Sequence, residues 1–172
     1  MKHIHNDGGR AAAGFKGSTG DCVTRAVAIA SGRQYTEVYA ALARGMGDQR
    51  KSKGATARNG VSVRRKWFKD YMASLGFKWV PTMLIGSGCK VHLNADELPM
   101  GRLVVAVSKH YTAVIDGVIH DTYDPSERGT TVYSAGYPDI PKGARPLGNG
   151  QFAYSPERCV YGYWIPVEEG AA

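Results

Sequence analysis

The most restrictive feature of the sequence is the run HYTAVIDGVIHDTY, residues 110–123, in which Asp116-Gly117 separates two segments rich in β-branched and aromatic residues. An Asp-Gly pair between such segments is typical of a type I′ turn, because both of its residues adopt positive φ and its twist matches that of two paired strands. The apolar run RLVVAVS, residues 102–108, precedes it and has the composition of a buried strand. The sequence therefore predicts neighbouring antiparallel strands between residues 102 and 123.

The predicted turn also decides which side chains of the hairpin share a face of the sheet. Directly opposed residues of two paired strands lie on the same face. Counting outward from a two-residue turn places His110 and Asp121 on one face, within reach of each other, and His120 and Asp124 on the other. A different turn type would reverse this assignment, since a register shift of one residue exchanges the faces.

Upstream of the hairpin the apolar residues follow a helical period. In residues 20–31 they recur at i, i+3, i+4 and i+7, which indicates an amphipathic helix with Asp21 or Thr19 as its cap and Gly32 at its end. Two further helices are expected before Gly76.

The order of the elements favours a single α+β domain over residues 1–172. We expect an irregular Gly-rich arm over 1–19, a helical half over 20–76, and an antiparallel β-sheet over 77–172 on which the helices pack. Residues 134–151 are rich in Gly and Pro and are expected to form one long loop, a kind of segment that is often functional.

Cys22 stands at the start of the first predicted helix, where a thiol can serve as a nucleophile. The thiolate is the reactive form, and the positive end of a helix and a neighbouring imidazolium both stabilise it. His110 is the best candidate for that imidazole, and Asp121, one strand later, would orient the ring. Each residue alone is more often structural, so the inference depends on the combination.

Two stretches, DGGRAAAGFKGSTGDCVTRAVAIASGRQYTEVY and LPMGRLVVAVSKHYTAVIDGVIHDTYDP, resemble uncharacterised phage and bacterial proteins of the papain-like cysteine peptidase fold. They cover about residues 7–40 and 98–125. The resemblance implies a papain-like domain with N-terminal helices on a C-terminal sheet. It also implies a catalytic triad, with Cys22 as the nucleophile, His110 as the general base and then the acid, and Asp121 as the orienting residue.

The resemblance further implies an oxyanion site, and there the sequence departs from the family. Papain-like enzymes place a Gln six residues before the Cys, whereas this chain has Lys16. Lys16 is therefore the candidate donor beside the backbone N–H of Cys22, with Asn6 as an alternative. Cell-wall peptidases of the Cys–His–His kind would make His120 the third residue, and Asp124 is a further alternative.

The formal net charge is +7, and much of the basic excess lies between residues 44 and 69. This basic segment is a candidate surface for an acidic substrate, an acidic partner or a nucleic acid, although runs of charge are often only solvated. Its candidate binding residues are Arg50, Lys51, Lys53, Arg58, Arg64 and Arg65.

Three functions fit these patterns. The first is a papain-like, phage-related thiol protease or hydrolase that cleaves an amide or isopeptide bond in a peptide or protein through a thioester on Cys22. The second is a non-catalytic protein of the same fold that binds or inhibits a host protein, or binds nucleic acid, through the basic segment. The third is a cell-wall peptidase of the Cys–His–His kind. None of the three implies a cofactor.

The composition also bears on the compartment. No apolar run reaches the ~18 residues needed to span a membrane, and the N-terminus lacks the apolar core of a secretory signal. The three irregularly spaced cysteines predict free thiols in a reducing cytoplasm, that of the host if a phage encodes the protein. Cys89 and His92 are possible metal ligands, but no second pair follows at zinc spacing, so no metal site is expected.

Overall fold

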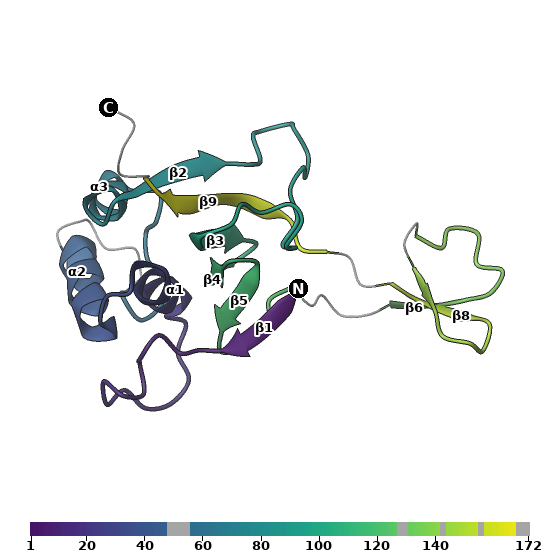
Figure 1. Cartoon of the computed structure of the whole chain (residues 1–172), viewed down its shortest axis with the longest axis horizontal. Coiled ribbons are helices and arrows are strands. Elements are labelled where there is room, and N and C mark those ends of the chain that lie inside the picture. Colours follow the sequence, from purple (N-terminus) through teal and green to yellow (C-terminus); the bar gives the residue numbers. More distant parts are fainter. Residues whose placement is uncertain (48–55, 127–130, 142–143, 155–156, 168–172) are drawn as a thin grey trace.

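The computed structural model describes residues 1–47, 56–126, 131–141, 144–154 and 157–167. These residues contain three helices and two β-sheets, which confirms the α+β class. The helices are α1 (Cys22–Ser31), α2 (Tyr35–Gly47) and α3 (Lys66–Ser74). Figure 1 shows them gathered at one side of the larger sheet, while the smaller sheet stands apart at the opposite end. Within the described ranges, no helix combines the length and the apolar character that crossing a membrane requires.

The larger sheet has six strands in the order β1-β5-β4-β3-β9-β2. They are β1 (Lys2–His5), β2 (Phe77–Pro81), β3 (Arg102–Val107), β4 (His110–Ile115), β5 (Val118–Asp121) and β9 (Val160–Pro166). The late strand β9 lies between β2 and β3 and pairs antiparallel with both. β9 therefore connects β2, which follows the helices in the chain, with β3 and the hairpin of β4 and β5.

The irregular arm that we expected over 1–19 covers only residues 6–19. Lys2–His5 form β1, which pairs parallel with β5 and makes the sheet mixed rather than wholly antiparallel. The backbone N–H of Asn6 continues this contact and donates to the backbone oxygen of Asp121 at 2.9 Å. The prediction failed because a parallel strand depends on a partner far along the chain, which the short run KHIH does not reveal.

The hairpin, by contrast, has the predicted turn and register. Asp116 and Gly117 have φ angles of 47° and 75°, as a type I′ turn requires. Ile115 pairs with Val118, and the antiparallel pairing continues outward from there. The face assignment of the hairpin side chains is therefore confirmed.

β3 is buried on both faces of the sheet, which explains its continuous apolar sequence. On one face Val104 belongs to a core built with side chains of the helices, such as Val27 of α1. On the other face Val105 packs in a second core with Leu93 and Leu98 of the segment before β3. The helices and this segment thus cover opposite sides of the same strand.

The segment 134–151 is mostly the expected loop, but it contains the two-residue strand β7 (Arg145–Pro146). With β6 (Thr131–Ser134) and β8 (Gln151–Tyr154), which bound the segment, β7 forms a small antiparallel sheet in the order β6-β8-β7, seen at the far end of Figure 1. Gly148 and Gly150 have φ angles of 82° and 74°, so the turn between β7 and β8 uses a conformation that favours glycine. The glycines therefore mark a tight turn between short strands.

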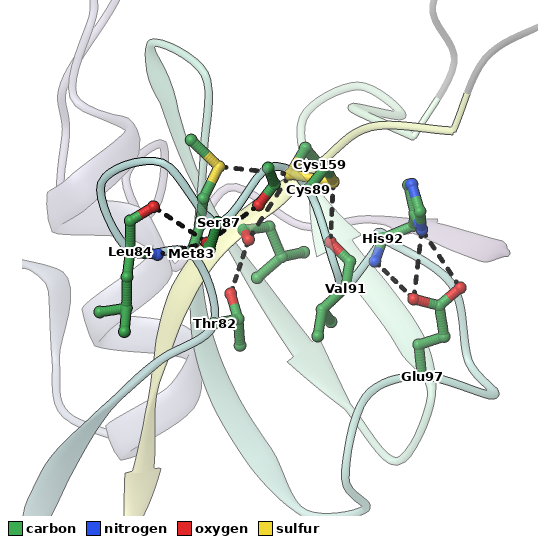
Figure 2. The surroundings of a disulfide bond; sticks show 11 residues. Thr82, Met83, Leu84, Ser87, Cys89, Val91, His92, Glu97 and Cys159 are labelled. Atoms are coloured by element: carbon green, nitrogen blue, oxygen red, sulfur yellow. Dashed lines mark hydrogen bonds and ion pairs between the residues drawn. A yellow bond between two sulfur atoms is a disulfide. The ribbon is translucent and has the colours of Figure 1, made fainter.

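The expectation of three free cysteines is wrong. Cys89 and Cys159 form a disulfide with their Cα atoms 5.8 Å apart (Figure 2). Cys22 is left as the free thiol. An isolated β-bridge between His92 and Cys159 brings the two segments together. A separation of 70 residues hid this pairing in the sequence. The cysteines therefore no longer support the expected reducing cytoplasm.

Candidate active site

Cys22 is the first residue of α1, at the positive end of the helix. The predicted end of the helix is confirmed, with Gly32 in the left-handed conformation at φ 70°. Asp21 occupies the N-cap position, but its side chain makes no capping hydrogen bond. The N–H groups of the first turn therefore have no side-chain cap, and they lie beside the thiol.

His110 and Asp121 form a buried pair at adjacent strands of the sheet. His110 Nε2 lies 2.7 Å from Asp121 Oδ2, and only 6% and 5% of the two side chains are exposed. The Cys22 thiol forms a hydrogen bond with the His110 side chain. Because Nε2 faces the carboxylate, Nδ1 is the ring nitrogen that remains for the thiol. The structure thus brings together all three residues of the predicted triad, in the predicted order.

The electrostatics of the three groups reinforce one another. Burial raises the pKa of the Cys22 thiol, but the hydrogen bond and the charge of His110 lower it more, so the pKa is lowered overall. Burial works against a protonated His110, yet its hydrogen bonds with Asp121 and Cys22 raise its pKa to about 9. Burial also raises the pKa of Asp121, and His110 outweighs this effect and lowers it. At neutral pH the arrangement therefore favours a thiolate–imidazolium pair.

A network of buried ion pairs connects the triad to the N-terminal segment. Asp21, which is fully buried, lies 3.0 Å from Arg10 Nε and 3.5 Å from Arg25 Nε, and it accepts a hydrogen bond from the Tyr35 hydroxyl. Arg25 Nη2 also lies 3.9 Å from Oδ1 of Asp121. A buried carboxylate needs such partners. Arg25 therefore links the two buried carboxylates, one of which is the orienting residue.

Four other candidate residues lie outside the triad. Lys16 is exposed and does not line the cavity beside the thiol. Asn6 Nδ2 lies 3.4 Å from His120 Nδ1, so these two candidates contact each other. Asp124 accepts hydrogen bonds from the backbone and the hydroxyl of Ser126. None of these contacts points to the reacting centre.

Asn59 is a polar residue of the site that the sequence did not single out. It lines the cavity and lies close to Gly20, which precedes α1 in the chain: a Cβ on Gly20 would come 2.6 Å from Asn59 Oδ1. Two backbone hydrogen bonds with Thr56 close a tight turn that holds it. The Thr24 hydroxyl ties this turn to α1 by donating to Ala57 O at 3.1 Å. The Asn59 amide is therefore a candidate second oxyanion donor beside the N–H groups of the helix.

A cavity of about 1160 Å³ opens beside Cys22 and His110, both of which line it, whereas Asp121 does not. The remaining walls come from the turn at Asn59, from β2 and β9, and from the loop over 83–88. Its size and its largely apolar and aromatic lining are those of a ligand site. The thiol therefore faces a space that holds part of a peptide.

The basic segment is described only in part. Outside the described residues lie Arg50, Lys51 and Lys53. Arg58, Arg64 and Arg65 are all exposed, and of these three Arg64 lines the cavity. The basic segment and the candidate site thus meet at Arg64.

One group of potential metal ligands occurs among the described residues. Ligand atoms of His92, Glu97 and Glu157 all lie within 4.8 Å of one another, whereas Cys89 is held in the disulfide. His92 Nδ1 is 3.2 Å from Glu97, and the Asn94 amide donates to both glutamates. Both carboxylates are exposed. These internal hydrogen bonds account for the cluster without an ion.

Comparison of the chain with protein-family models, with curated proteins and with solved structures finds no match. The geometry of Cys22, His110 and Asp121 and the cavity beside Cys22 and His110 are therefore the features that bear on function.

Proposed function

We propose that the chain is a cysteine hydrolase with a papain-like arrangement, phage-related, that cleaves an amide or isopeptide bond in a peptide or protein. The observation that carries the proposal is the buried His110 Nε2–Asp121 Oδ2 hydrogen bond of 2.7 Å, with Cys22 hydrogen-bonded to the same imidazole. A merely structural cysteine needs neither a paired imidazolium nor a cavity, and Cys22 has both.

In the first half of the reaction the Cys22 thiolate attacks the carbonyl carbon and a C–S bond forms. The carbonyl oxygen becomes an oxyanion, which the backbone N–H of Cys22 and the amide of Asn59 stabilise. The C–N bond then breaks, and His110 gives its proton to the leaving amine. The acyl group is left as a thioester on Cys22, with a neutral imidazole beside it.

In the second half water attacks the thioester while His110 accepts a proton from it. The C–S bond breaks, the acid product leaves, and the thiolate and the imidazolium are restored. Asp121 keeps its negative charge throughout and holds Nε2–H, so that Nδ1 faces the reaction.

Asp121 is better supported than His120 as the third residue. His120 contacts Asn6 on the opposite face of the hairpin and has no contact with His110. The Cys–His–His alternative would need His120 to contact His110, whereas His120 lies beside Asn6. Binding of nucleic acid through the basic segment has no comparable observation in its favour.

The rate of Cys22 alkylation by iodoacetamide, followed against pH by mass spectrometry, tests the proposal. Cys22 is the free thiol of the chain, so the whole-protein mass reports on it. We expect fast alkylation at about pH 6, where an ordinary thiol of pKa about 8.5 is almost wholly protonated. In His110→Ala the pKa of Cys22 should rise towards that of an ordinary thiol. The alkylation rate at this pH should then fall by about tenfold for each pKa unit regained, and by about tenfold or more in total.

His120→Ala is the matched control and should leave the rate within about twofold. If His120→Ala slows alkylation as much as His110→Ala does, the Cys–His–His arrangement replaces the proposed triad. If Cys22 reacts like a free thiol in every variant, the hydrolase proposal fails.

A further inference from the structure

The Lys and Arg side chains that line the cavity beside Cys22 have no acidic counterpart there. Arg25, Arg64, Lys69 and Lys109 contribute to its walls, and among the described residues no Asp or Glu does so. Arg25 is engaged by the two buried carboxylates. The other three are exposed, and none of them forms an ion pair within the described part of the chain.

Two exposed basic side chains elsewhere on the described surface have an acidic partner. Lys66 Nζ lies 2.7 Å from Asp70 on α3, and Arg33 lies 4.0 Å from Glu37 of α2. Lys69 is in the same helix as Lys66 but lines the cavity instead. What distinguishes the cavity is that three such cations gather around one space beside Cys22, where they can meet an acidic ligand.

The rim of the cavity is apolar and unusually exposed. Leu84 and Ile85 of the loop after β2 have relative exposures of 66% and 107%, and both line the cavity. The loop is anchored beside the disulfide, where Met83 Sδ lies 3.7 Å from Cys159 Sγ (Figure 2). Ser87 closes it through hydrogen bonds with the N–H and the carbonyl of Leu84. An anchored loop with exposed apolar side chains at a cavity mouth is suited to contact an apolar ligand group.

Two tryptophans supply an aromatic part of the cavity lining. The rings of Trp79 and Trp164 are 5.3 Å apart, and both residues line the cavity. Gly162 leaves the space for this arrangement, because a Cβ there would come 2.2 Å from Trp79 Cζ2. The cavity therefore combines an apolar, aromatic surface with unpaired positive charge.

We propose that the Cys22 site acts on peptide segments that carry acidic side chains next to a large apolar side chain. This inference rests on the proposed hydrolase function and names its substrate class. The apolar side chain lies against Trp79 and the loop at Leu84 and Ile85, and the carboxylates pair with Arg64, Lys69 and Lys109. The positive cavity also raises the rate at which acidic peptides arrive, so the preference weakens as salt screens the charges.

Two pools of internally quenched peptides, alike except that one has Glu and the other Lys at each charged position, test the inference. We expect wild-type kcat/KM to be about tenfold higher for the Glu pool, the effect that three exposed charge pairs supply together. In Arg64→Gln/Lys69→Gln/Lys109→Gln the ratio should fall to about twofold or less, while Cys22 alkylation stays fast. Lys78→Gln is the control, because Lys78 is exposed but does not line the cavity, and it should keep the tenfold ratio.

Binding of the same two pools to Cys22→Ala, measured by fluorescence anisotropy, separates the two proposals. If wild type cleaves both pools equally well, the acidic preference is overturned and the hydrolase function stands. If neither pool is cleaved but Cys22→Ala binds the Glu pool preferentially, the hydrolase function fails while the ligand class stands. If there is no cleavage and no preference in binding, both are overturned.

Discussion

Two histidine–carboxylate pairs occur among the described residues, His110 with Asp121 in the main sheet and His92 with Glu97 in the loop before β3. In the first pair the nitrogen and the oxygen are 2.7 Å apart and the side chains are 6% and 5% exposed. In the second they are 3.2 Å apart and the side chains are 35% and 34% exposed. Water competes for the second pair but is excluded from the first. The same two residue types therefore make a charged site in one place and a surface contact in the other.

The two pairs are also held in place by different means. β4 and β5 place His110 and Asp121 side by side, on the sheet face that they share with Val114 and Ile119 of the second core. The segment that carries His92 has no regular strand. Leu93 anchors it in the same core, and the bond between Cys89 and Cys159 fixes it to the start of β9. Strand pairing thus positions the buried pair, whereas a loop fastened by a disulfide carries the exposed pair.

The largest expected effect on stability comes from removing that link in Cys89→Ser/Cys159→Ser. The disulfide joins residues 70 positions apart, and loss of such a closed loop lowers the free energy of unfolding by about 4 kcal/mol in the chain-entropy model. Urea unfolding measures the loss. The alkylation rate of Cys22 in the folded variant should stay within about twofold, because the disulfide makes no contact with the triad. A change of about tenfold or more would show that the two regions are coupled.

Asp121→Asn has the next largest expected effect. It leaves a buried imidazolium without its carboxylate, which should lower the free energy of unfolding by about 2 kcal/mol, the cost of a lost hydrogen bond between charged groups. Glu97→Gln is the matched change in the exposed pair and should cost less than about 0.5 kcal/mol. Urea unfolding of both variants at neutral pH makes the comparison. Equal losses would mean that burial does not distinguish the two pairs.

The pH dependence of stability gives a smaller effect with a definite sign. His110 has a pKa of about 9 in the folded protein, above its ordinary 6.5, and the pKa of Cys22 is lowered from 9.0. Between pH 6.5 and 9 His110 therefore binds more proton in the folded protein than in the unfolded chain, whereas Cys22 binds less. The two differences have opposite signs and cancel in part, so the wild-type stability changes less with pH in this window than His110 alone would make it.

Cys22→Ser removes that cancellation. The contribution of His110 is then fully present below about pH 6.5 and is lost as the pH rises through its folded pKa, by about 1 kcal/mol. Urea midpoints of Cys22→Ser and Cys22→Ser/His110→Gln at several pH values isolate this contribution. A slope in wild type together with a flat profile in Cys22→Ser would contradict the thiolate–imidazolium pair.

The sequence predicted the buried pair because its geometry is local. Asp116-Gly117 fixes the register of the hairpin, and that register alone places His110 and Asp121 on one face. The proximity of Cys22 to this pair was expected from the chemistry of the three residue types and from a resemblance, because no local pattern joins α1 to β4. The packing of α1 against the sheet decides where Cys22 lies, and no local pattern in the sequence reveals that packing.

The features that the sequence missed all depend on distant partners. β1 finds β5 more than a hundred residues away, and Cys89 finds Cys159 across 70. Asn59 enters the site because a short turn is tied to α1 through Thr24. Its neighbours in the chain carry no periodic or catalytic pattern, so only the folded arrangement singles it out.

Glu97→Gln has the smallest expected effect on the free energy of unfolding. The response of that effect to pH and salt distinguishes the exposed His92–Glu97 pair from the buried His110–Asp121 pair. The hydrogen bond from the His92 backbone N–H is the main reason that the pKa of Glu97 is lowered. The carboxylate therefore contributes stability above its ordinary pKa of 4.5, and the contribution is lost as the pH falls below it. A glutamine oxygen still accepts from that N–H, so only the charge is lost. Any difference from wild type at neutral pH should shrink progressively as the pH falls below 4.5 and should vanish in about 1 M NaCl.

Asp121→Asn is the control for this measurement, because salt screens a buried pair much less than an exposed one. Its loss of stability should persist in 1 M NaCl to within about a quarter of the low-salt value. If salt removes the effect of Asp121→Asn as completely as that of Glu97→Gln, then solvent reaches the His110 pair. The imidazolium would then be stabilised by water rather than by Asp121 and Cys22, and the thiolate beside it would lose its main physical support.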